Sequence, residues 1–338
     1  MGPHGASTGE RVVIEGADHG ASVIHASAGA LEHGRRSTGA LDAPVYSIVI
    51  LTYARDGVVQ ELLAELMGHL GDRQDYEVIL VDNNVDDVDR GAWLEPFAQG
   101  RWLQIGFNKG VVARNDGMAA ARGEIIILVD DDCFVQTPDF LDQFGAAYNQ
   151  DPKIGAVTTR KFIGKTMTVR RDIIPHTDKS IDLLQPFFTF RVVGGVMSFR
   201  KAMFDGVGGF SADFFYGLEE IEYAYRIVEA GWKILYTPAV VSLELEHEGG
   251  RRPAIEVTTN RLTNKYIISY LHMPFPHILM NYALFTPYTL IFYRGQTNVP
   301  KAIMDFARWL RRPDRPKRRP IGREAKSYIR ACGGSLWR

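Results

Sequence analysis

Cysteine is scarce in this chain: its 338 residues include two, Cys133 and Cys332, which lie far apart in the sequence. Such a pair provides neither a disulfide framework nor a cysteine-ligated zinc site, and we expect a protein of the reducing cytoplasm. Two phosphate-binding signatures are absent as well. No G-x-G-x-x-G turn follows the first predicted strand and no G-x-x-x-x-G-K-S/T loop occurs, which disfavours hydride transfer and P-loop ATPase chemistry.

Long apolar runs are also few. Residues 1–44 are rich in Gly, Ala, Ser and His and lack the apolar core of a signal peptide, so we expect a mostly disordered leader. Residues 275–293 are uncharged over 19 positions, but two prolines, Pro276 and Pro287, interrupt them. These prolines favour an interfacial or core segment, and a membrane-spanning helix is the alternative.

Charge is unevenly distributed, although the formal net charge is only −1. Residues 301–338 contain 12 Lys and Arg against 3 Asp and Glu, a net +9, which leaves −10 for residues 1–300. A basic tail of this kind either contacts an anionic membrane surface, as in a peripheral protein on the cytoplasmic face, or is simply solvated. No aromatic-interleaved basic face accompanies the tail, so we expect no nucleic-acid partner.

What the chain does contain is the composition of a globular protein, with 46% hydrophobic and 23% charged residues, and an α/β pattern. Apolar runs typical of strands are found at residues 46–52, 77–82, 102–105 and 124–132. Helical spacing follows the first run at residues 62–70 and precedes the last one at residues 109–122. This alternation predicts a parallel sheet.

After residue 154 the alternation breaks. Shorter strand-like runs follow at residues 154–159, 191–199 and 232–236. Helical patterns begin near Leu218 and at residue 258, the second of them extending to residue 271. Proline and glycine separate these runs, which predicts a mixed second half.

Three consecutive carboxylates, Asp130, Asp131 and Asp132, end the apolar run that follows Glu124. The run has the length and the β-branched content of a strand buried on both faces, so its acids lie at the carboxyl edge of the sheet, where open α/β sheets bind ligands. Clustered carboxylates repel one another, and hard cations such as Mg²⁺ or Mn²⁺ neutralise them well. We therefore expect a divalent metal at this edge.

Further polar segments occur in a fixed order along the chain. They are Thr52-Tyr53-Ala54-Arg55, Asp82-Asn83-Asn84, the run from Asn108 to Gly117 that contains Ala113-Arg114-Asn115, Gly194-Gly195, Gly208-Gly209-Phe210, Glu219-Glu220-Ile221-Glu222, and His247 with Gly250. Together with the three aspartates, this series resembles the metal-dependent, inverting glycosyltransferases of the GT-A fold, family 2, over roughly Tyr46 to Leu271. The ordered series is far more specific than a lone D-x-D motif.

The resemblance implies an α/β fold: a Rossmann-like, mostly parallel sheet flanked by helices, with a mixed acceptor-side half and a helical C-terminal extension. It divides the chain into the leader at 1–44, a catalytic domain at 45–271 and the extension at 272–338, which is first apolar and then basic. Within the catalytic domain, residues 45–132 would bind the nucleotide and residues 133–271 the acceptor.

The resemblance also implies roles for individual residues. Asp82 would accept the N–H of a uracil or thymine base, against which Thr52 and Tyr53 pack. The implied donor-binding residues are Thr52, Tyr53, Arg55, Asp82, Asn108, Arg114, Asp130 and Asp131, and the implied ligands of Mn²⁺ or Mg²⁺ are Asp130, Asp132 and His247. For Arg114 a solvent-facing position on a helix is equally expected, and for His247 a satisfied loop histidine.

An inverting transfer needs a carboxylate that takes the proton of the acceptor hydroxyl. Glu220 occupies the position where the family has Asp, and because its side chain is longer, Glu219 is a second candidate. A structural alternative is that Glu219 and Glu220 complement a helix amino end. For Glu222 we expect only an ion pair with Arg226 at i, i+4 spacing.

The function implied is the transfer of a single sugar from a UDP- or dTDP-linked donor to a hydroxyl acceptor, which is a glycan, a lipid-linked saccharide or a small natural product. Two alternatives remain. Glu220 in place of Asp would permit a non-catalytic protein that binds carbohydrate or nucleotide sugar. A sugar nucleotidyltransferase would need a basic, Gly-rich loop after the first strand, where the chain offers only Arg55.

Overall fold

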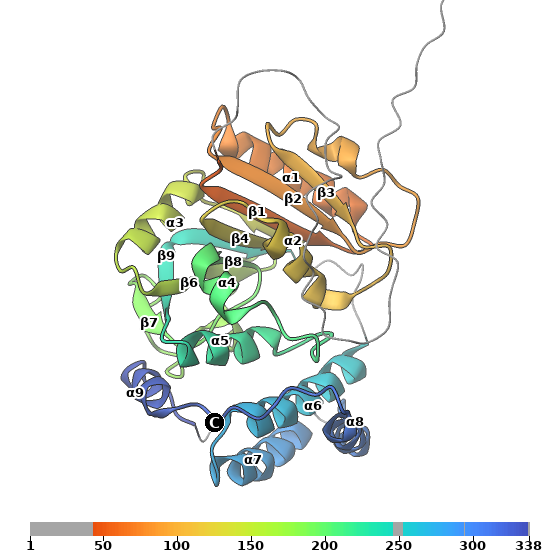
Figure 1. Cartoon of the computed structure of the whole chain (residues 1–338), viewed down its shortest axis with the longest axis vertical. Coiled ribbons are helices and arrows are strands. Elements are labelled where there is room, and N and C mark those ends of the chain that lie inside the picture. The colour runs from red at the N-terminus through yellow and green to blue at the C-terminus, as the bar shows by residue number, and fades with distance from the viewer. Residues whose placement is uncertain (1–42, 246–252, 294, 337–338) are drawn as a thin grey trace, which may run out of the picture.

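The computed structural model describes residues 43–245, 253–293 and 295–336. Nearly all of the predicted leader, and with it the prediction of disorder, lies outside the described residues, and so does His247. The remaining chain forms a layered α/β body with a layer of helices beneath it (Figure 1).

The strands are β1 (Tyr46–Thr52), β2 (Tyr76–Asp82), β3 (Gly100–Gln104), β4 (Ile125–Asp130), β5 (Cys133–Val135), β6 (Ile154–Ile163), β7 (Phe187–Thr189), β8 (Val196–Arg200) and β9 (Lys233–Glu244). The helices are α1 (Asp56–Leu70), α2 (Arg114–Ala120), α3 (Phe140–Asn149), α4 (Lys201–Val207), α5 (Glu219–Glu229), α6 (Ala254–His272), α7 (His277–Phe292), α8 (Val299–Arg311) and α9 (Arg323–Ala331). Short 3₁₀ turns occur at Gly91–Leu94, Gly110–Ala113 and Arg171–Ile173.

The strands form one sheet in the order β3-β2-β1-β4-β8-β6-β9-β5, with β7 added beside β9. The first four strands of this order are parallel, and their register pairs Thr52 with Asp82 and Leu51 with Asp130. Beyond β4 the sheet is mixed, because β8 runs antiparallel to both β4 and β6. The predicted fold class is confirmed, and the carboxyl ends of β1, β2 and β4 meet at one edge.

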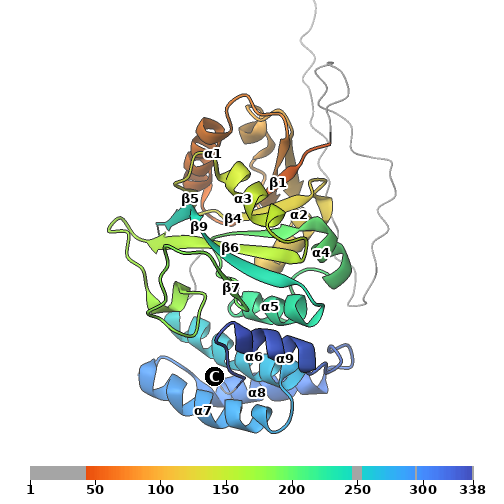
Figure 2. The same cartoon turned by 90° about the vertical axis from the view of Figure 1, so that its left-hand side faces the viewer.

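Helices cover both faces of the sheet, which explains why β1, β2 and β4 are apolar without alternation. Ile48 and Ile50 pack with α1 and α3 on one face, and Val49 packs with α2 on the other. The same side as α2 carries α4 and α5 (Figures 1 and 2). Each fully buried Ile or Val stabilises the fold by about 1.5–3 kcal/mol relative to an exposed one.

Two predicted elements are shorter than expected. The helix predicted at 109–122 is observed as a 3₁₀ turn followed by α2: the turn begins at Gly110, which has a φ of +70°, and α2 ends at Ala120 because the C-cap residue Ala121 is extended. The strand predicted at 191–199 begins only at Val196, since Gly195 has a φ of +114° and turns the chain.

Helices α6 to α9 form the layer beneath α5 (Figure 2). Helix α6 packs against α7 and α8, and α9 packs against α5. The uncharged segment at 275–293 contains α7, at the end of the molecule opposite α1 (Figures 1 and 2). Of the helices described, none has the length and hydropathy that crossing a bilayer requires.

Candidate active site

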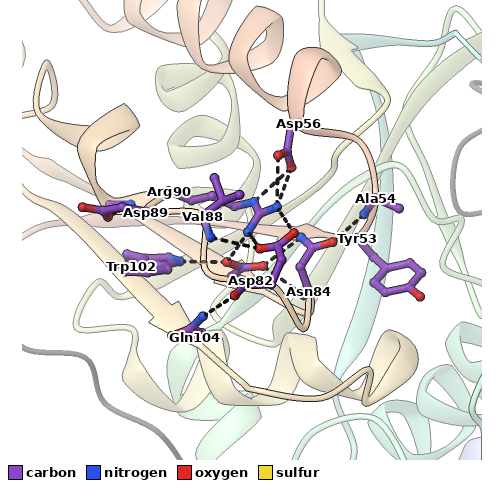
Figure 3. A network of polar contacts seen from close by, with 12 residues as sticks. Tyr53, Ala54, Asp56, Asp82, Asn84, Val88, Asp89, Arg90, Trp102 and Gln104 are labelled. Carbon is purple, nitrogen blue, oxygen red and sulfur yellow. Dashed lines mark hydrogen bonds and ion pairs between the residues drawn. The ribbon is translucent and has the colours of Figure 1, made fainter.

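The carboxylate of Asp82, at the end of β2, lies in a closed network (Figure 3). Its side chain is completely buried. One oxygen accepts hydrogen bonds from the backbone and side-chain nitrogens of Asn84 at 2.9 and 2.8 Å. The other accepts from Arg90 Nη1 at 3.1 Å and from Trp102 Nε1 at 3.2 Å. No exposed oxygen remains, so the geometry does not support the predicted contact between Asp82 and a base.

Arg90 is the centre of this network. Its buried guanidinium also donates to both oxygens of Asp56, at 3.0 Å each, and to both oxygens of Asp86, at 2.6 and 2.9 Å. Hydrogen bonds and the surrounding negative charge raise the pKa of Arg90 above its ordinary value, although burial opposes this. The network therefore locks the end of β2 to the start of α1 and to the loop that follows β2.

Asparagines after β2 fix the two turns that face the site. Asn84 Oδ1 accepts from the backbone nitrogen of Ala54 at 2.8 Å, which holds the turn after β1 and leaves the ring of Tyr53 38% exposed. Asn83 Oδ1 accepts from Lys109 N at 3.0 Å, and its Nδ2 donates to Asn108 Oδ1 at 3.2 Å. Asn108 therefore shapes a turn, and the ring of Tyr53 is accessible to a ligand.

Asp131 and Asp132, after β4, share one cationic partner. Arg55 Nη1 lies 2.5 Å from Asp131 Oδ1 and 2.9 Å from Asp132 Oδ2. The backbone nitrogen of Tyr53 adds a hydrogen bond to Asp131 at 3.3 Å. Burial dominates over the attraction of Arg55 and raises the pKa of Asp131 to about 6, and burial likewise raises the pKa of Asp132. These two carboxylates are thus only partly compensated.

Arg114 begins α2 and is buried, so the expectation of a solvent-facing arginine is wrong. It forms a short ion pair with Asp130, and its Nη1 lies 3.8 Å from Glu219 Oε1. The charges of Asp130, Glu219 and Glu220 raise the pKa of Arg114 against the effect of burial. Arg114 therefore joins the end of β4 to the start of α5.

Helix α5 presents its first two residues to the same place. Leu218, in the left-handed conformation, precedes the helix and turns the chain into it. Glu219 is 3% exposed, and burial together with the negative charge of Glu220 raises its pKa to about 8. Its Oε2 has no hydrogen-bond partner within the described part of the chain.

Glu220 and Asp130 converge at Gly194. A Cβ atom on Gly194 would lie 2.6 Å from Glu220 Oε1, so that carboxylate would have to move, and 3.8 Å from Asp130 Oδ2, an ordinary contact distance. Lys161 Nζ donates to the carbonyl oxygen of Gly194 at 2.9 Å and forms a short ion pair with Glu244. The half-buried Glu220 therefore lies near Asp130, beside a backbone segment that Lys161 holds in place.

Glu222 does not belong to this group, and its predicted pairing is confirmed. Its carboxylate lies 2.9 Å from Arg226 Nη2 and 3.0 Å from His272 Nε2. Although burial opposes it, hydrogen bonds from His272 and Arg226 hold the pKa of Glu222 below its usual value. Glu222 ties α5 to α6.

Lys161 and Glu244 were not identified from the sequence. They lie on β6 and β9, which pair in parallel across about 80 intervening residues. The strand predicted there ended at Thr159, two residues before Lys161, and no motif marks either residue. Their contribution depends on long-range strand pairing and has no local signal.

The donor chemistry of the site suits a hard divalent cation. Six carboxylates and three cations interact here among the described residues: Asp130, Asp131, Asp132, Glu219, Glu220 and Glu244 with Arg55, Arg114 and Lys161. This excess of carboxylates over cations fits Mn²⁺ or Mg²⁺. In the geometry described, no three His, Cys, Asp or Glu side chains converge as ligands, and His247 lies outside the described residues.

Sequence comparisons find similar proteins. Residues 47–208 match the model of Glycosyl transferase family 2, and residues 181–248 match that of the N-terminal domain of galactosyltransferase. The chain is 24% identical over 265 residues to the N-acetylglucosaminyl-diphospho-decaprenol L-rhamnosyltransferase of Mycobacterium tuberculosis, covering 68% of this chain and 85% of the relative. It is 30% identical over 174 residues to the uncharacterized glycosyltransferase YwdF of Bacillus subtilis, covering 49% and 62%.

Solved structures show the same fold. GalNAc-T7 with UDP, GalNAc and Mn²⁺ superposes with a TM-score of 0.56 at 15% identity, over 79% of this chain and 55% of that one. The mannosyltransferase PcManGT from Pyrobaculum calidifontis, with GDP-Man and Mn²⁺, superposes with a TM-score of 0.51 at 18% identity. The match covers 86% of this chain and 84% of that one. TarS of S. aureus superposes with a TM-score of 0.54 at 15% identity, over 78% of this chain and 48% of that one.

This chain thus spans about half the length of the GalNAc-T7 and TarS chains. At such low identity these likenesses concern the fold, and the sequence matches carry the activity. The chain is a transferase enzyme with the GT-A fold, and its residues 47–208 are similar to glycosyltransferase family 2.

Proposed function

We propose that the protein is an inverting glycosyltransferase that moves one sugar from a UDP- or dTDP-linked donor to a hydroxyl group of a lipid-linked saccharide. The name of the Mycobacterium tuberculosis relative supports this acceptor class, because that protein acts on a saccharide linked through diphosphate to decaprenol. The UDP in the GalNAc-T7 complex supports the donor class. We also propose a cytoplasmic location and a three-part chain with its catalytic domain at residues 45–271.

The observation that carries the proposal is the convergence of Glu220 and Asp130 at Gly194. Glu220 is the half-buried carboxylate beside the strand-end acids, and it takes the proton of the acceptor hydroxyl from the face opposite the leaving diphosphate. Glu219 is the buried neighbour whose pKa of about 8 keeps it protonated at neutral pH. Two adjacent carboxyl groups in such different environments divide the roles of base and neutral neighbour.

The other residues of the site bind and orient the substrates. The exposed ring of Tyr53 offers a surface on which a base stacks, in place of the enclosed Asp82. Arg114 holds Asp130 and Glu219 in fixed positions, and Lys161 holds the backbone at Gly194. When bound by Asp130 and Asp132, with His247 as a third ligand, Mn²⁺ or Mg²⁺ would neutralise the charge that develops on the diphosphate.

Donor turnover tests the proposal. The wild-type chain is incubated with Mn²⁺ and a panel of UDP- and dTDP-sugars, and release of the nucleoside diphosphate is measured with Glu220→Gln beside it. We expect release with at least one donor, and a loss of about 10²–10⁴-fold in Glu220→Gln. Glu61→Gln, an exposed position on α1, is the matched control and keeps full activity.

Two results would contradict the proposal. Equal turnover by wild type and Glu220→Gln would exclude Glu220 as the base. A product whose anomeric configuration, read by nuclear magnetic resonance, is the same as that of the donor would exclude inversion.

A further inference from the structure

Helix α7 exposes most of its large apolar side chains. Its two buried side chains are polar, with Asn281 2% exposed and Thr289 1% exposed, while Ile278, Tyr282 and Phe285 pack half-buried against the neighbouring elements. Asn281 Nδ2 donates to the carbonyl oxygen of Leu336 at 3.0 Å, and Thr286 Oγ1 bonds to the hydroxyl of Tyr266 at 2.7 Å. A helix at a water-facing surface normally buries its apolar side and exposes its polar side.

The outward face of α7 is apolar along its whole length. Its exposed side chains are Leu279 (56%), Met280 (40%), Leu284 (49%), Tyr288 (44%), Leu290 (48%), Ile291 (70%) and Phe292 (65%). Met280, Leu284, Tyr288 and Ile291 follow one another at helical spacing, so they form a continuous stripe. An exposed apolar stripe of this size is typical of a surface that binds an apolar partner.

Neighbouring segments extend the stripe. Phe275, just before α7, is 72% exposed. Helix α8 packs beside α7, where the rings of Phe306 and Tyr282 lie 5.8 Å apart, and it exposes Ile303 (52%) and Met304 (51%). Two adjacent helices thus both expose apolar side chains.

Charge identifies the partner. Residues 275–293 carry no charge, whereas residues 301–338 carry a net +9. Several of these cations are exposed, among them Arg308, Arg311 and Arg319. A second copy of the chain would bring two such basic segments together, and they would repel each other. An anionic lipid surface accepts both the apolar stripe and the positive charge.

The stripe also has a defined relation to the active site. Asn264 on α6 donates to the carbonyl oxygen of Gly217 at 2.6 Å, two residues before Glu219. On the same helix, Tyr266 receives a hydrogen bond from the hydroxyl of Tyr282 on α7 at 3.1 Å. A single helix therefore separates α7 from the loop that leads to the catalytic carboxylates.

We propose that α7 lies in the plane of an anionic bilayer surface, with its apolar stripe among the lipid chains and the basic residues after it on the headgroups. Docked in this way, the helix on the bilayer is separated only by α6 from the loop that leads to Glu219. The docking needs no sugar nucleotide, so it stands or falls separately from the proposed reaction.

Vesicle sedimentation of the full chain tests this proposal. The vesicles consist of phosphatidylcholine alone or of phosphatidylcholine mixed with anionic phosphatidylglycerol. We expect the wild type to sediment with the anionic vesicles and high salt to weaken the binding. The triple variant Met280→Gln, Leu284→Gln and Ile291→Gln should lose more than about tenfold in partitioning, because three apolar side chains no longer enter the lipid.

A matched control replaces apolar residues that are equally exposed elsewhere. Val85→Gln and Leu184→Gln, at positions 70% and 61% exposed, should bind vesicles as the wild type does. Equal binding by the triple variant and the wild type would overturn the proposal, as would a wild type that sediments with neither vesicle. A wild-type dimer in analytical ultracentrifugation that the triple variant dissociates would also overturn it, since a second copy would then cover α7.

Discussion

Two acidic strand ends lie at the same edge of the sheet and differ in how their charge is compensated. At the end of β2, both oxygens of Asp82 accept two hydrogen bonds each, and Arg90 is 1% exposed. At the end of β4, burial raises the pKa values of Asp131 and Asp132 despite their ion pairs with Arg55. The β2 cluster, which consists of Asp82, Asn84, Arg90 and Trp102, is complete: its carboxylate is fully hydrogen-bonded without a ligand. The β4 cluster, which consists of Asp131, Asp132 and Arg55, leaves its carboxylates only partly compensated.

Unpaired polar atoms reinforce this difference. Within the described residues, Arg114 Nη1 and Glu219 Oε2 are buried near the β4 cluster without a hydrogen-bond partner. Each such group costs about 1–3 kcal/mol of stability. Residues that bind a ligand tolerate this cost, because the ligand supplies the partner. The comparison therefore separates a cluster that stabilises the fold from one that is suited to bind substrate.

The largest effect is expected from Arg90→Met, in the complete cluster. The substitution leaves Asp82 as a buried, unpaired charge, and we expect the free energy of unfolding to fall by about 3–5 kcal/mol, measured by urea denaturation. Adding Asp82→Asn should restore part of this loss, because the buried charge is then removed. If Arg90→Met unfolds like the wild type, the distinction between the two clusters fails.

The next effect is expected at Gly194, in the incomplete cluster. In Gly194→Ala the new Cβ would clash with Glu220 Oε1, so we expect the carboxylate to be displaced and turnover to fall about 100-fold. Gly206→Ala, where a Cβ meets nothing within 4 Å, is the matched control. Equal turnover by the two variants would show that the approach of Glu220 to Asp130 is not needed.

Glu219 gives a smaller, pH-dependent effect. Its folded pKa of about 8 lies above the unfolded value of 4.5, so the folded state binds the extra proton between these values and stability falls as pH rises through them. Glu219→Gln removes this contribution. Between pH 6.5 and 7.5 we expect the free energy of unfolding to fall by about 1 kcal/mol less in Glu219→Gln than in the wild type, measured by urea denaturation at both pH values. An unchanged slope would show that Glu219 is already ionised.

Local patterns predicted much of this site. The apolar runs into Thr52, Asp82 and Asp130 identified three strands, and parallel pairing places their ends together. The spacing of Glu222 and Arg226 predicted their ion pair. Each of these inferences depends on residues close in sequence or on one general rule of sheet geometry.

The remaining features depend on contacts that no local pattern encodes. Arg90 follows Asp82 by eight residues in a loop without periodicity, so nothing indicated that it encloses the carboxylate. Gly110 interrupts a predicted helix because the backbone of Phe215, more than 100 residues later, approaches it: a Cβ there would lie 2.6 Å from the Phe215 carbonyl oxygen. Such contacts are set by the packing of the whole chain.

The smallest expected effect concerns Arg55, whose guanidinium contacts the acids to which the resemblance assigns the metal and the donor. If the β4 cluster is suited to bind a cation, Arg55 and Mn²⁺ compete for Asp132. We therefore expect Arg55→Gln to bind Mn²⁺ several-fold more tightly, measured by electron paramagnetic resonance without sugar nucleotide. Arg73→Gln, whose guanidinium pairs with Asp75 and Asp142 away from the site, should bind as the wild type does. If Arg55→Gln binds Mn²⁺ more weakly than the wild type, Arg55 organises the carboxylates for the metal instead of competing with it. The β4 cluster would then depend on Arg55 as the β2 cluster depends on Arg90.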